Sequence, residues 1–393
     1  MTERLAVDVA IIGGGTAACA AAVALREAGL TVAVLEKRLC GAGASGVNFG
    51  GVRQQGRHLA ELPLARRARA LWDDLNQLLG EDVEFEASGH IKLARSETDM
   101  AELERYAESA REHGLALTLL GANAVRDELP WVGPKVHGAS LSPTDGQANP
   151  RVVGPAYARL ARKHGAEVRE FTPVRHAMST GSGFEIEADG VTVKSRWLVN
   201  TAGAGAGVVA SWFGERAPVS PLMPNMLVTE PLPYVVSRSI GVCGGDVYVR
   251  QIRRGNVILG GGHGWGDAEL GLARPQVEES LGSMGRAVDI VPALAGAQVI
   301  RIWSGMDGQM PDHIPVIGFS STTPRLVHAF GFSGHGFQLG PVIGLIISEL
   351  IEEGRTISPI APFAPQRFAN WTGESVAACG DAQMRVASKP TSD

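Results

Sequence analysis

Cysteine is scarce in this chain. Its 393 residues include only Cys19, Cys40, Cys243 and Cys379, which form neither a CxxC pair nor a zinc-type spacing. These cysteines cannot supply the ligands of an iron–sulfur cluster. Cysteines scattered in this way are typical of reduced packing residues, which favours a cytoplasmic location.

Long hydrophobic runs are missing as well. Residues 7–12 form a short apolar run that includes Asp8 and leads straight into a glycine turn, unlike a secretory signal peptide. The apolar stretch at 342–351 carries Ser348 and Glu349 and is too short to cross a bilayer. We therefore expect a soluble protein without a transmembrane segment.

An excess of basic charge is a third absence. The chain has 36 Lys and Arg against 41 Asp and Glu, a formal net charge of −5. This balance gives no electrostatic reason to expect nucleic acid or an acidic membrane surface as a partner. The histidines form no HxH or HExxH pair, so no metal site is indicated. Together these absences favour a small-molecule ligand.

Glycine, in contrast, is abundant, with 50 residues. In the first cluster, Gly13, Gly15 and Ala18 match the pattern GxGxxG/A directly after a strand-like run and at the start of an Ala-rich helical run. Gly13 permits the tight turn, Gly15 lets the backbone approach a pyrophosphate, and Ala18 allows close helix–strand packing. The free N–H groups of the helix then face the phosphates. We expect a bound dinucleotide here; the alternative is a loop that only makes a turn.

Glu36 ends the second strand of this βαβ unit. A carboxylate at that place can accept hydrogen bonds from both ribose hydroxyls of the adenosine, which disfavours the 2′-phosphate of NADP.

Three further motifs occur in order along nearly the whole chain: ASGVNFGG at 44–51, LVNTAGAGAG at 198–207 and GFSGHGFQLGP at 331–341. With them the chain resembles the D-amino-acid oxidase family of FAD enzymes, which includes glycine oxidase and sarcosine oxidase. The segment GGVRQQGRHLAELPLARR, from residue 50, is most similar to sarcosine-oxidase β-subunit relatives, including the β-subunits of opine and D-hydroxyproline dehydrogenases. The resemblance implies FAD as the cofactor.

The patterning and the resemblance together predict an α/β plus α+β architecture. A Rossmann-like FAD-binding domain is expected from three discontinuous segments, 1–75, 150–218 and 320–378. It is interleaved with a substrate-binding domain from segments 76–149 and 219–319, which is expected to be built on a mainly antiparallel sheet. Residues 247–262 are predicted to form a pair of strands in this sheet. Residues 379–393 are expected to be a flexible tail.

The resemblance also assigns residues to the cofactor. The pyrophosphate is expected on the first glycine cluster with Ser45 nearby, the ribose on Glu36, and the adenine on the backbone of Val174. The flavin ring is expected beside Asn48 and Gly50 and at the start of the last helix. The positive N-terminus of that helix can face the flavin pyrimidine edge, where the reduced flavin carries negative charge. The expected cofactor residues are Gly13, Gly14, Gly15, Thr16, Ala17, Ala18, Glu36, Lys37, Ser45, Asn48, Gly50, Val174, Ala202, Gly203, Gly334, His335, Gly336, Phe337 and Gln338.

Members of this family oxidise a C–N bond by hydride transfer from the carbon next to nitrogen to flavin N5, and water hydrolyses the imine. The protein need only orient the amine and neutralise a carboxylate. Candidate carboxylate binders are Arg53 and Arg250, with Tyr248 and His335 as further candidate site residues. The alternatives are a solvated edge position for the arginines, a satisfied core role for Tyr248, and a place between two glycines for His335.

Departures from family patterns refine the expectation. Where glycine oxidases read GLRP with a substrate-binding arginine, this chain has GMDG at 305–308. Monomeric sarcosine oxidases carry a flavin-linking cysteine at the Gly305 position and a lysine at the Gln338 position, and both are missing, so the FAD is expected to be non-covalent. The covalent FMN histidine of heterotetrameric sarcosine oxidase falls at Pro150. FMN or an iron–sulfur cluster is therefore expected only through a partner subunit.

Residues 247–262 contain no lysine, although sarcosine oxidase-like enzymes use one there to promote reaction with oxygen. This favours a dehydrogenase that oxidises a secondary or cyclic amino acid (an opine, D-hydroxyproline or a sarcosine-like compound) as the catalytic β-type subunit of a hetero-oligomer. The alternatives are a stand-alone amine or D-amino-acid oxidase producing hydrogen peroxide, and a non-catalytic flavoprotein subunit.

Overall fold

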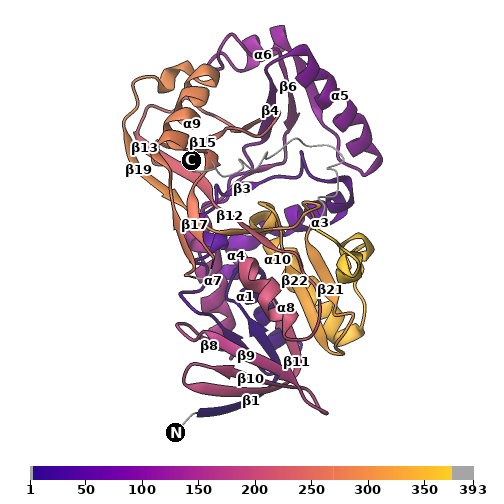
Figure 1. Ribbon diagram of the computed structural model, residues 1–393. Coiled ribbons are helices and arrows are strands. Elements are labelled where there is room, and N and C mark those ends of the chain that lie inside the picture. Colours follow the sequence, from indigo (N-terminus) through magenta and orange to yellow (C-terminus); the bar gives the residue numbers. More distant parts are fainter. Residues whose placement is uncertain (1–2, 269, 374–393) are drawn as a thin grey trace, which may run out of the picture.

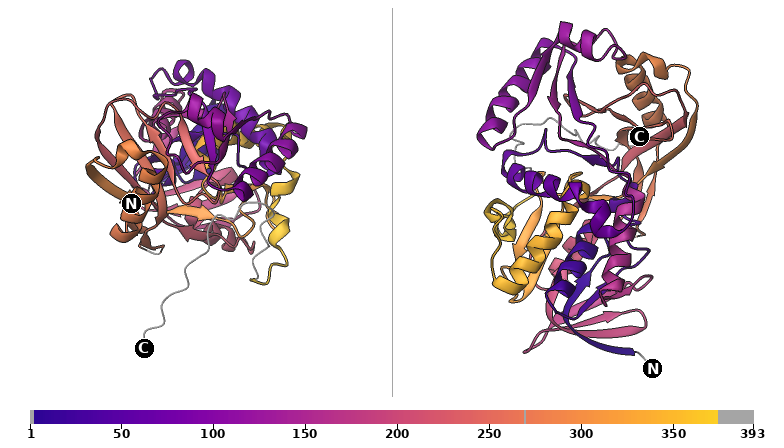
Figure 2. Two further views of the ribbon diagram at one scale, coloured as in Figure 1. Left: turned by 90° about the horizontal axis from the view of Figure 1, so that it is seen from above. Right: turned by 180° about the vertical axis from the view of Figure 1, so that it is seen from behind.

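The computed structural model describes residues 3–268 and 270–373, so the expected tail at 379–393 and Cys379 lie outside the described residues. Figure 1 shows an elongated molecule in which two sheet-containing parts lie one above the other. The chain passes between these parts several times, and Figure 2 shows the same two parts from behind.

The first sheet is assembled from distant parts of the chain. Its strands are β1 (Glu3–Ile12), β2 (Val32–Leu35), β8 (Glu167–Arg169), β9 (Val174–Ser179), β10 (Phe184–Ala188), β11 (Val191–Asn200), β21 (Val316–Phe319) and β22 (Leu326–Phe330). The order is β21-β22-β11-β1-β2-β8, with β10 and β9 added beside β11. The pairs from β22 to β8 are parallel, so their carboxyl ends meet at one edge, where a dinucleotide binds in such folds.

Ten helices are described. They are α1 (Thr16–Glu27), α2 (Ala44–Val47), α3 (Leu62–Asp73), α4 (Leu75–Leu79), α5 (Glu97–Glu112), α6 (Ala122–Glu128), α7 (Pro150–Lys163), α8 (Ala206–Ser211), α9 (Val277–Ile290) and α10 (Gly336–Glu353). The close packing of α1 against α10 depends on small residues. A Cβ added to Gly344 would lie 2.5 Å from Cβ of Ala20, so only glycine lets the two helices approach this closely.

The second sheet is mainly antiparallel. Its strands are β4 (His90–Ala94), β5 (Thr118–Gly121), β6 (Gly138–Ser142), β13 (Pro224–Pro231), β14 (Ser239–Val242), β15 (Tyr248–Gln251), β16 (Asn256–His263) and β19 (Val299–Ser304). They follow the order β19-β13-β16-β15-β14-β4-β6-β5, in which β14 and β4 form a parallel pair. Three small pairs complete the strands: β3 (Gly51–Val52) with β7 (Gly146–Gln147), β12 (Ser220–Leu222) with β20 (Asp307–Gln309), and β17 (Trp265–Asp267) with β18 (Leu272–Arg274).

Side-chain alternation divides the second sheet into an apolar and a polar face. Ile91 and Leu93 of β4 and Val249 of β15 belong to a buried apolar core shared with α9. The intervening residues His90, Lys92 and Tyr248 line a cavity on the opposite face. The polar face of this sheet is therefore turned toward the first sheet.

The predicted fold class is confirmed. The strand pair expected at 247–262 is β15 and β16, which pair antiparallel. Residues 62–79 form two helices, α3 and α4, which are separated at Asp74. The domain boundaries drawn from the sequence remain a prediction.

Candidate active site

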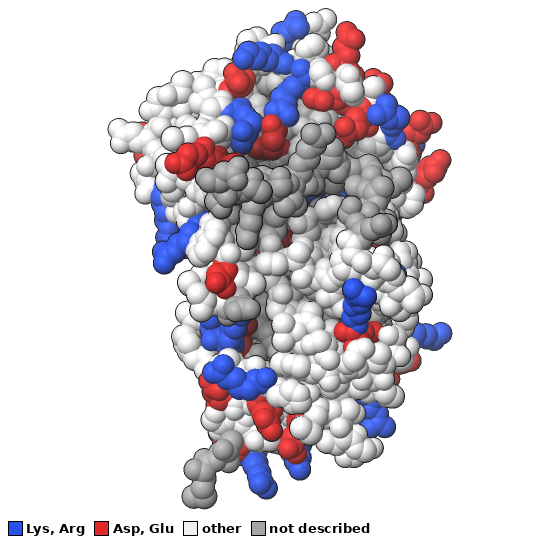
Figure 3. All heavy atoms as spheres, in the orientation of Figure 1, with Lys and Arg blue, Asp and Glu red and all other residues white. Residues whose placement is uncertain are grey.

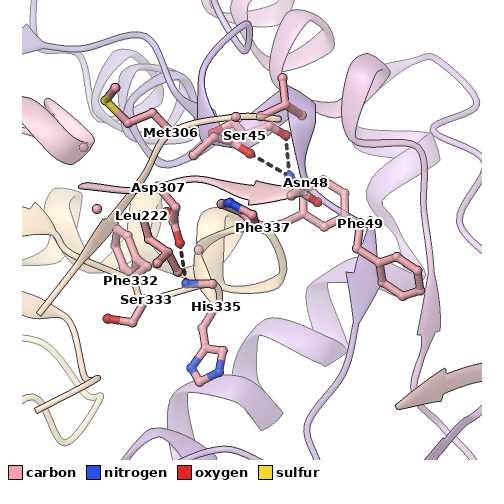
Figure 4. A pocket seen from close by; sticks show the side chains of 18 of the residues that line it. Ser45, Asn48, Phe49, Leu222, Met306, Asp307, Phe332, Ser333, His335 and Phe337 are labelled. Carbon is pink, nitrogen blue, oxygen red and sulfur yellow. Dashed lines mark hydrogen bonds between the residues drawn. The ribbon is translucent and has the colours of Figure 1, made fainter. Parts of the chain in front are cut away.

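A cavity of about 820 Å³ lies between the two sheets. It extends from the N-terminus of α1 and the end of β2, past α2, to the polar face of the second sheet and the N-terminus of α10. Figure 4 shows the part around Ser45, Asp307 and His335. The cavity thus joins the first glycine cluster to the motif at 331–341.

The glycine cluster has the geometry that its sequence predicts. Gly13 has φ +104°, and a Cβ there would lie 2.5 Å from the carbonyl oxygen of Thr201. Gly15 precedes α1 without a side-chain cap, and the backbone N–H of Thr16 donates to the hydroxyl of Ser45 at 3.0 Å. The α1 N-terminus therefore presents donors and a positive helix end to the cavity, which fits a pyrophosphate.

Glu36 is held in place by backbone donors. Its Oε2 accepts from the N–H of Gly14 at 2.6 Å, and its Oε1 accepts from the N–H of Arg38 at 2.8 Å. The carboxylate lies at the end of β2 and lines the cavity beside Lys37, as a ribose-binding group would.

The last motif positions the N-terminus of α10. His335 precedes the helix and has no side-chain cap. Oδ2 of Asp307 accepts from the N–H of Gly334 at 2.6 Å, as the dashed line in Figure 4 shows. Burial raises the pKa of Asp307 to about 6, against the opposing hydrogen bonds from the N–H groups of Gly334 and Gly308.

His335 contacts a buried pair of charged side chains, Glu61 and Arg57. Nδ1 of His335 lies 2.9 Å from Oε2 of Glu61, and Nη1 of Arg57 lies 3.9 Å from the other carboxylate oxygen. Burial acts to raise the pKa of Glu61, but His335 and Arg57 outweigh it and lower this pKa.

The loop that carries Arg53 is fixed by a buried carboxylate. Oδ2 of Asp145 accepts from the N–H of Gln54 at 2.8 Å and from the N–H of Gln55 at 3.2 Å. Nη1 of Arg53 donates to the carbonyl of Gln55 at 2.6 Å, and the carbonyl of Arg53 accepts from Nε of Arg57 at 2.9 Å. The Arg53 guanidinium is thereby held at the cavity wall.

The polar face of the second sheet adds an aromatic and cationic stack. The ring of Tyr248 meets Phe49 edge-on at 4.7 Å between centroids, and the Arg250 guanidinium lies 5.4 Å from the same Phe49 ring. Burial raises the pKa of Tyr248, with a smaller contribution from Asp307. Tyr248 lines the cavity, whereas the buried Arg250 does not.

Most of the residues that the sequence singled out meet in this cavity. Its lining includes Gly13, Gly14, Gly15, Thr16, Ala17, Ala18, Glu36, Lys37, Ser45, Asn48, Gly50, Arg53, Ala202, Gly203, Tyr248, Gly334, His335, Gly336 and Phe337. Val174, Gln338 and Arg250 do not line it. Val174 begins β9, and Gln338 donates from Nε2 to the carbonyl of Ala65 at 2.7 Å inside the core. The roles assigned to all these residues remain proposals.

Sequence reasoning missed other residues at this site, namely Arg57, Glu61, His90, Lys92 and Asp145. The polar–apolar alternation of His90-Ile91-Lys92-Leu93 was a usable signal, because it marks a strand with one face toward a polar space. Asp145 gave no local signal, since the residues that it holds are distant in sequence, and nothing near Glu61 indicates its contact with His335.

Metal clusters and membrane-spanning helices are both absent from the described residues. Within 3–268 and 270–373, no group of three His, Cys, Asp or Glu side chains could hold a metal ion. No helix in the same ranges has the length and apolarity needed to cross a membrane. Figure 3 shows acidic and basic side chains interspersed on the face in view.

Comparisons with known proteins agree with this geometry. A family model described as "FAD dependent oxidoreductase" (DAO) matches residues 8–350. Glycine oxidase of Geobacillus kaustophilus is 28% identical over 95% of this chain and 100% of its own, and its crystal structure superposes with a TM-score of 0.87. An opine oxidase subunit from Rhizobium meliloti is 28% identical over 92% of this chain and 98% of its own. The crystal structure of L-proline dehydrogenase from P. horikoshii has a TM-score of 0.86 at 26% identity and covers 94% of this chain and 99% of its own. The chain belongs to the DAO family of FAD-dependent oxidoreductases.

Proposed function

We propose that this chain oxidises the C–N bond of a secondary or cyclic amino acid, as the catalytic subunit of a dehydrogenase. The observation that carries the proposal is one cavity that joins a dinucleotide-binding helix end to a polar sheet face bearing Lys92 and Tyr248, with Arg53 on a loop in the same lining. The similarity to glycine oxidase, to an opine oxidase and to L-proline dehydrogenase supports an amino-acid substrate. The opine oxidase relative is one subunit of its enzyme, which supports a partner chain here.

The residues present fit FAD. Gly13 to Ala18 and the uncapped start of α1 would hold the pyrophosphate, Glu36 the ribose, and the α10 N-terminus the flavin pyrimidine edge. When bound, the flavin supplies a two-electron acceptor for the hydride of the carbon next to nitrogen. The protein's own part is to orient the substrate and to exclude water from it.

The FAD is held without a covalent bond in this proposal. A Cβ at Gly305 would lie 1.9 Å from Cγ2 of Val47, so the Val47 side chain occupies the space that a flavin-linking side chain at that position would need. Val47 and Gly305 both line the cavity.

The choice of a dehydrogenase rests on the strands β15 and β16, which carry no lysine toward the cavity. Strand β4, which is separated from β15 by β14, does place Lys92 in the lining, so reaction with oxygen needs a direct measurement.

That measurement is a visible spectrum of the purified protein, recorded before and after anaerobic addition of sarcosine, proline and hydroxyproline isomers and opines. We expect one amino acid to bleach the flavin and air to restore the colour slowly. Rapid recovery with peroxide would make the protein an oxidase. Flavin that no amine bleaches would indicate a non-catalytic subunit, and no flavin bands after incubation with FAD would refute the proposal.

A further inference from the structure

Asp307 is an acidic side chain in the cavity that no cation neutralises among the described residues. Its carboxylate lines the cavity from β20 and accepts from the backbone N–H of Gly334. Its cross-strand neighbour is the apolar Leu222 of β12, and Figure 4 shows both near Phe332. Within the part of the chain that the structure describes it makes no ion pair, although most carboxylates with this little solvent do. A partly buried charge without a partner suits a ligand of opposite charge.

Cations gather at another part of the same cavity. A Cβ on Gly56 would lie 3.2 Å from Nη1 of Arg53 and 3.7 Å from Nζ of Lys92, so these two side chains flank the same glycine. Arg57 lies in the same loop and also lines the cavity. Arg53 makes no ion pair among the residues that the structure describes, whereas Lys92 pairs at 3.8 Å with the partly exposed Glu102. Arg53 therefore has a free positive charge to offer.

The two groups of opposite charge line the same cavity from different elements. Asp307 comes from β20, whereas Arg53 comes from the loop after β3 and lies beside Lys92 of β4. A ligand that carries both a positive and a negative group can therefore meet a group of opposite charge from each element.

We propose that Asp307 binds the amino group of the substrate while Arg53 binds its carboxylate, so that the site selects zwitterions. The inference rests on the proposed amino-acid function and adds the group that recognises the nitrogen. Asp307 orients the substrate rather than changing its redox state. At neutral pH and above its carboxylate is mainly ionised.

The test compares three ligands that share a five-membered ring: proline, pyrrolidine, which lacks the carboxylate, and tetrahydrofuran-2-carboxylate, which lacks the amine. Their affinities for the holoenzyme are measured at pH 8 without oxygen, from the change in the flavin spectrum, or, for a ligand that bleaches the flavin, from the dependence of the bleaching rate on its concentration. We expect wild-type protein to bind proline at least 10-fold more tightly than tetrahydrofuran-2-carboxylate, because a charge-assisted hydrogen bond is lost with the amine.

The variants separate the two ends. Asp307→Asn keeps an oxygen acceptor for the N–H of Gly334, and it should weaken proline and pyrrolidine about 10-fold or more while changing tetrahydrofuran-2-carboxylate less than about 3-fold. Arg53→Met should weaken proline and tetrahydrofuran-2-carboxylate about 10-fold or more while changing pyrrolidine less than about 3-fold. Asp312→Asn is the matched control, because Asp312 belongs to the segment after β20, pairs with Arg367 at 2.7 Å and does not line the cavity. Asp307→Ser serves if the amide variant does not take up FAD.

Two results would overturn the inference. Wild-type holoenzyme that binds the carboxylate-only ligand as tightly as proline shows no recognition of nitrogen. An Asp307→Asn variant that shifts all three ligands equally, together with the affinity for FAD, shows that Asp307 faces the cofactor. Failure of the wild-type protein to take up FAD at all would instead refute the proposed function.

Discussion

Nδ1 of His335 lies 2.9 Å from Oε2 of Glu61, a carboxylate with no exposed surface. The pair connects the start of α10 to the segment just before α3, which are separated by 274 residues in the chain. Burial lowers the pKa of His335 and Glu61 partly restores it. Two distant segments at the cavity are thus joined by a buried charged contact.

Glu61→Gln should destabilise the protein by about 3 kcal/mol, because it leaves Arg57 buried without its carboxylate. Thermal and denaturant unfolding measure the loss. Glu81→Gln is the matched control, since Glu81 forms an ion pair with the exposed Arg159 and should cost less than about 1 kcal/mol. Equal effects of both substitutions would contradict the importance of the buried contact.

Gly13→Ala should abolish tight FAD binding. Its φ of +104° and the carbonyl of Thr201 leave no place for a methyl group, so the turn that receives the pyrophosphate must move. The affinity is measured by quenching of flavin fluorescence. Gly29→Ala is the control, because Gly29 also has a positive φ of +86° but has nothing within 4 Å of an added Cβ. That variant should lose about 1 kcal/mol of stability and keep its affinity for FAD.

Glu36→Gln should weaken FAD binding about 10-fold, since a charged acceptor for ribose hydroxyls becomes a neutral amide. The same fluorescence titration tests this expectation. An unchanged affinity, with apoprotein of lower stability, would mean that Glu36 serves only the N–H groups of Gly14 and Arg38.

The lowered pKa of Glu215 predicts how the stability of the protein depends on pH. Burial acts to raise its pKa, but hydrogen bonds from His328, Ser320 and Ser321 outweigh it and lower the pKa to about 2 from 4.5. A lowered folded-state pKa adds stability above pH 4.5 that is lost as the pH falls toward 2, about 3 kcal/mol in all. Melting temperatures of wild type and Glu215→Gln should therefore differ at pH 7 and converge below pH 4. If the difference between the two melting temperatures did not change with pH, this role of Glu215 would be contradicted.

The sequence predicted those parts of the site that depend on backbone conformation. Gly13 and Gly15 were found because a turn before a helix restricts these positions locally. The strands and helices around them followed from hydrophobic periodicity in the same way.

The remaining parts of the site depend on long-range packing. Asp145 holds Gln54 across 91 residues, and nothing near either residue indicates that contact. The sequence offered Arg250 as a candidate substrate contact because it shares a strand with Tyr248, but Arg250 is buried outside the cavity lining, and its guanidinium lies 5.4 Å from the Phe49 ring. Phe49 belongs to another element, so the strand alone cannot reveal this contact.

The contact between Gly305 and Val47 has a consequence for the living cell. Because no side chain fits at Gly305, a tether to the cofactor could not arise there by one mutation; Val47 would have to change as well. With FAD bound without a tether, as proposed above, the fraction of protein that carries FAD would be set by the free FAD concentration relative to the dissociation constant. We expect the active fraction of this enzyme to rise and fall with the riboflavin supply.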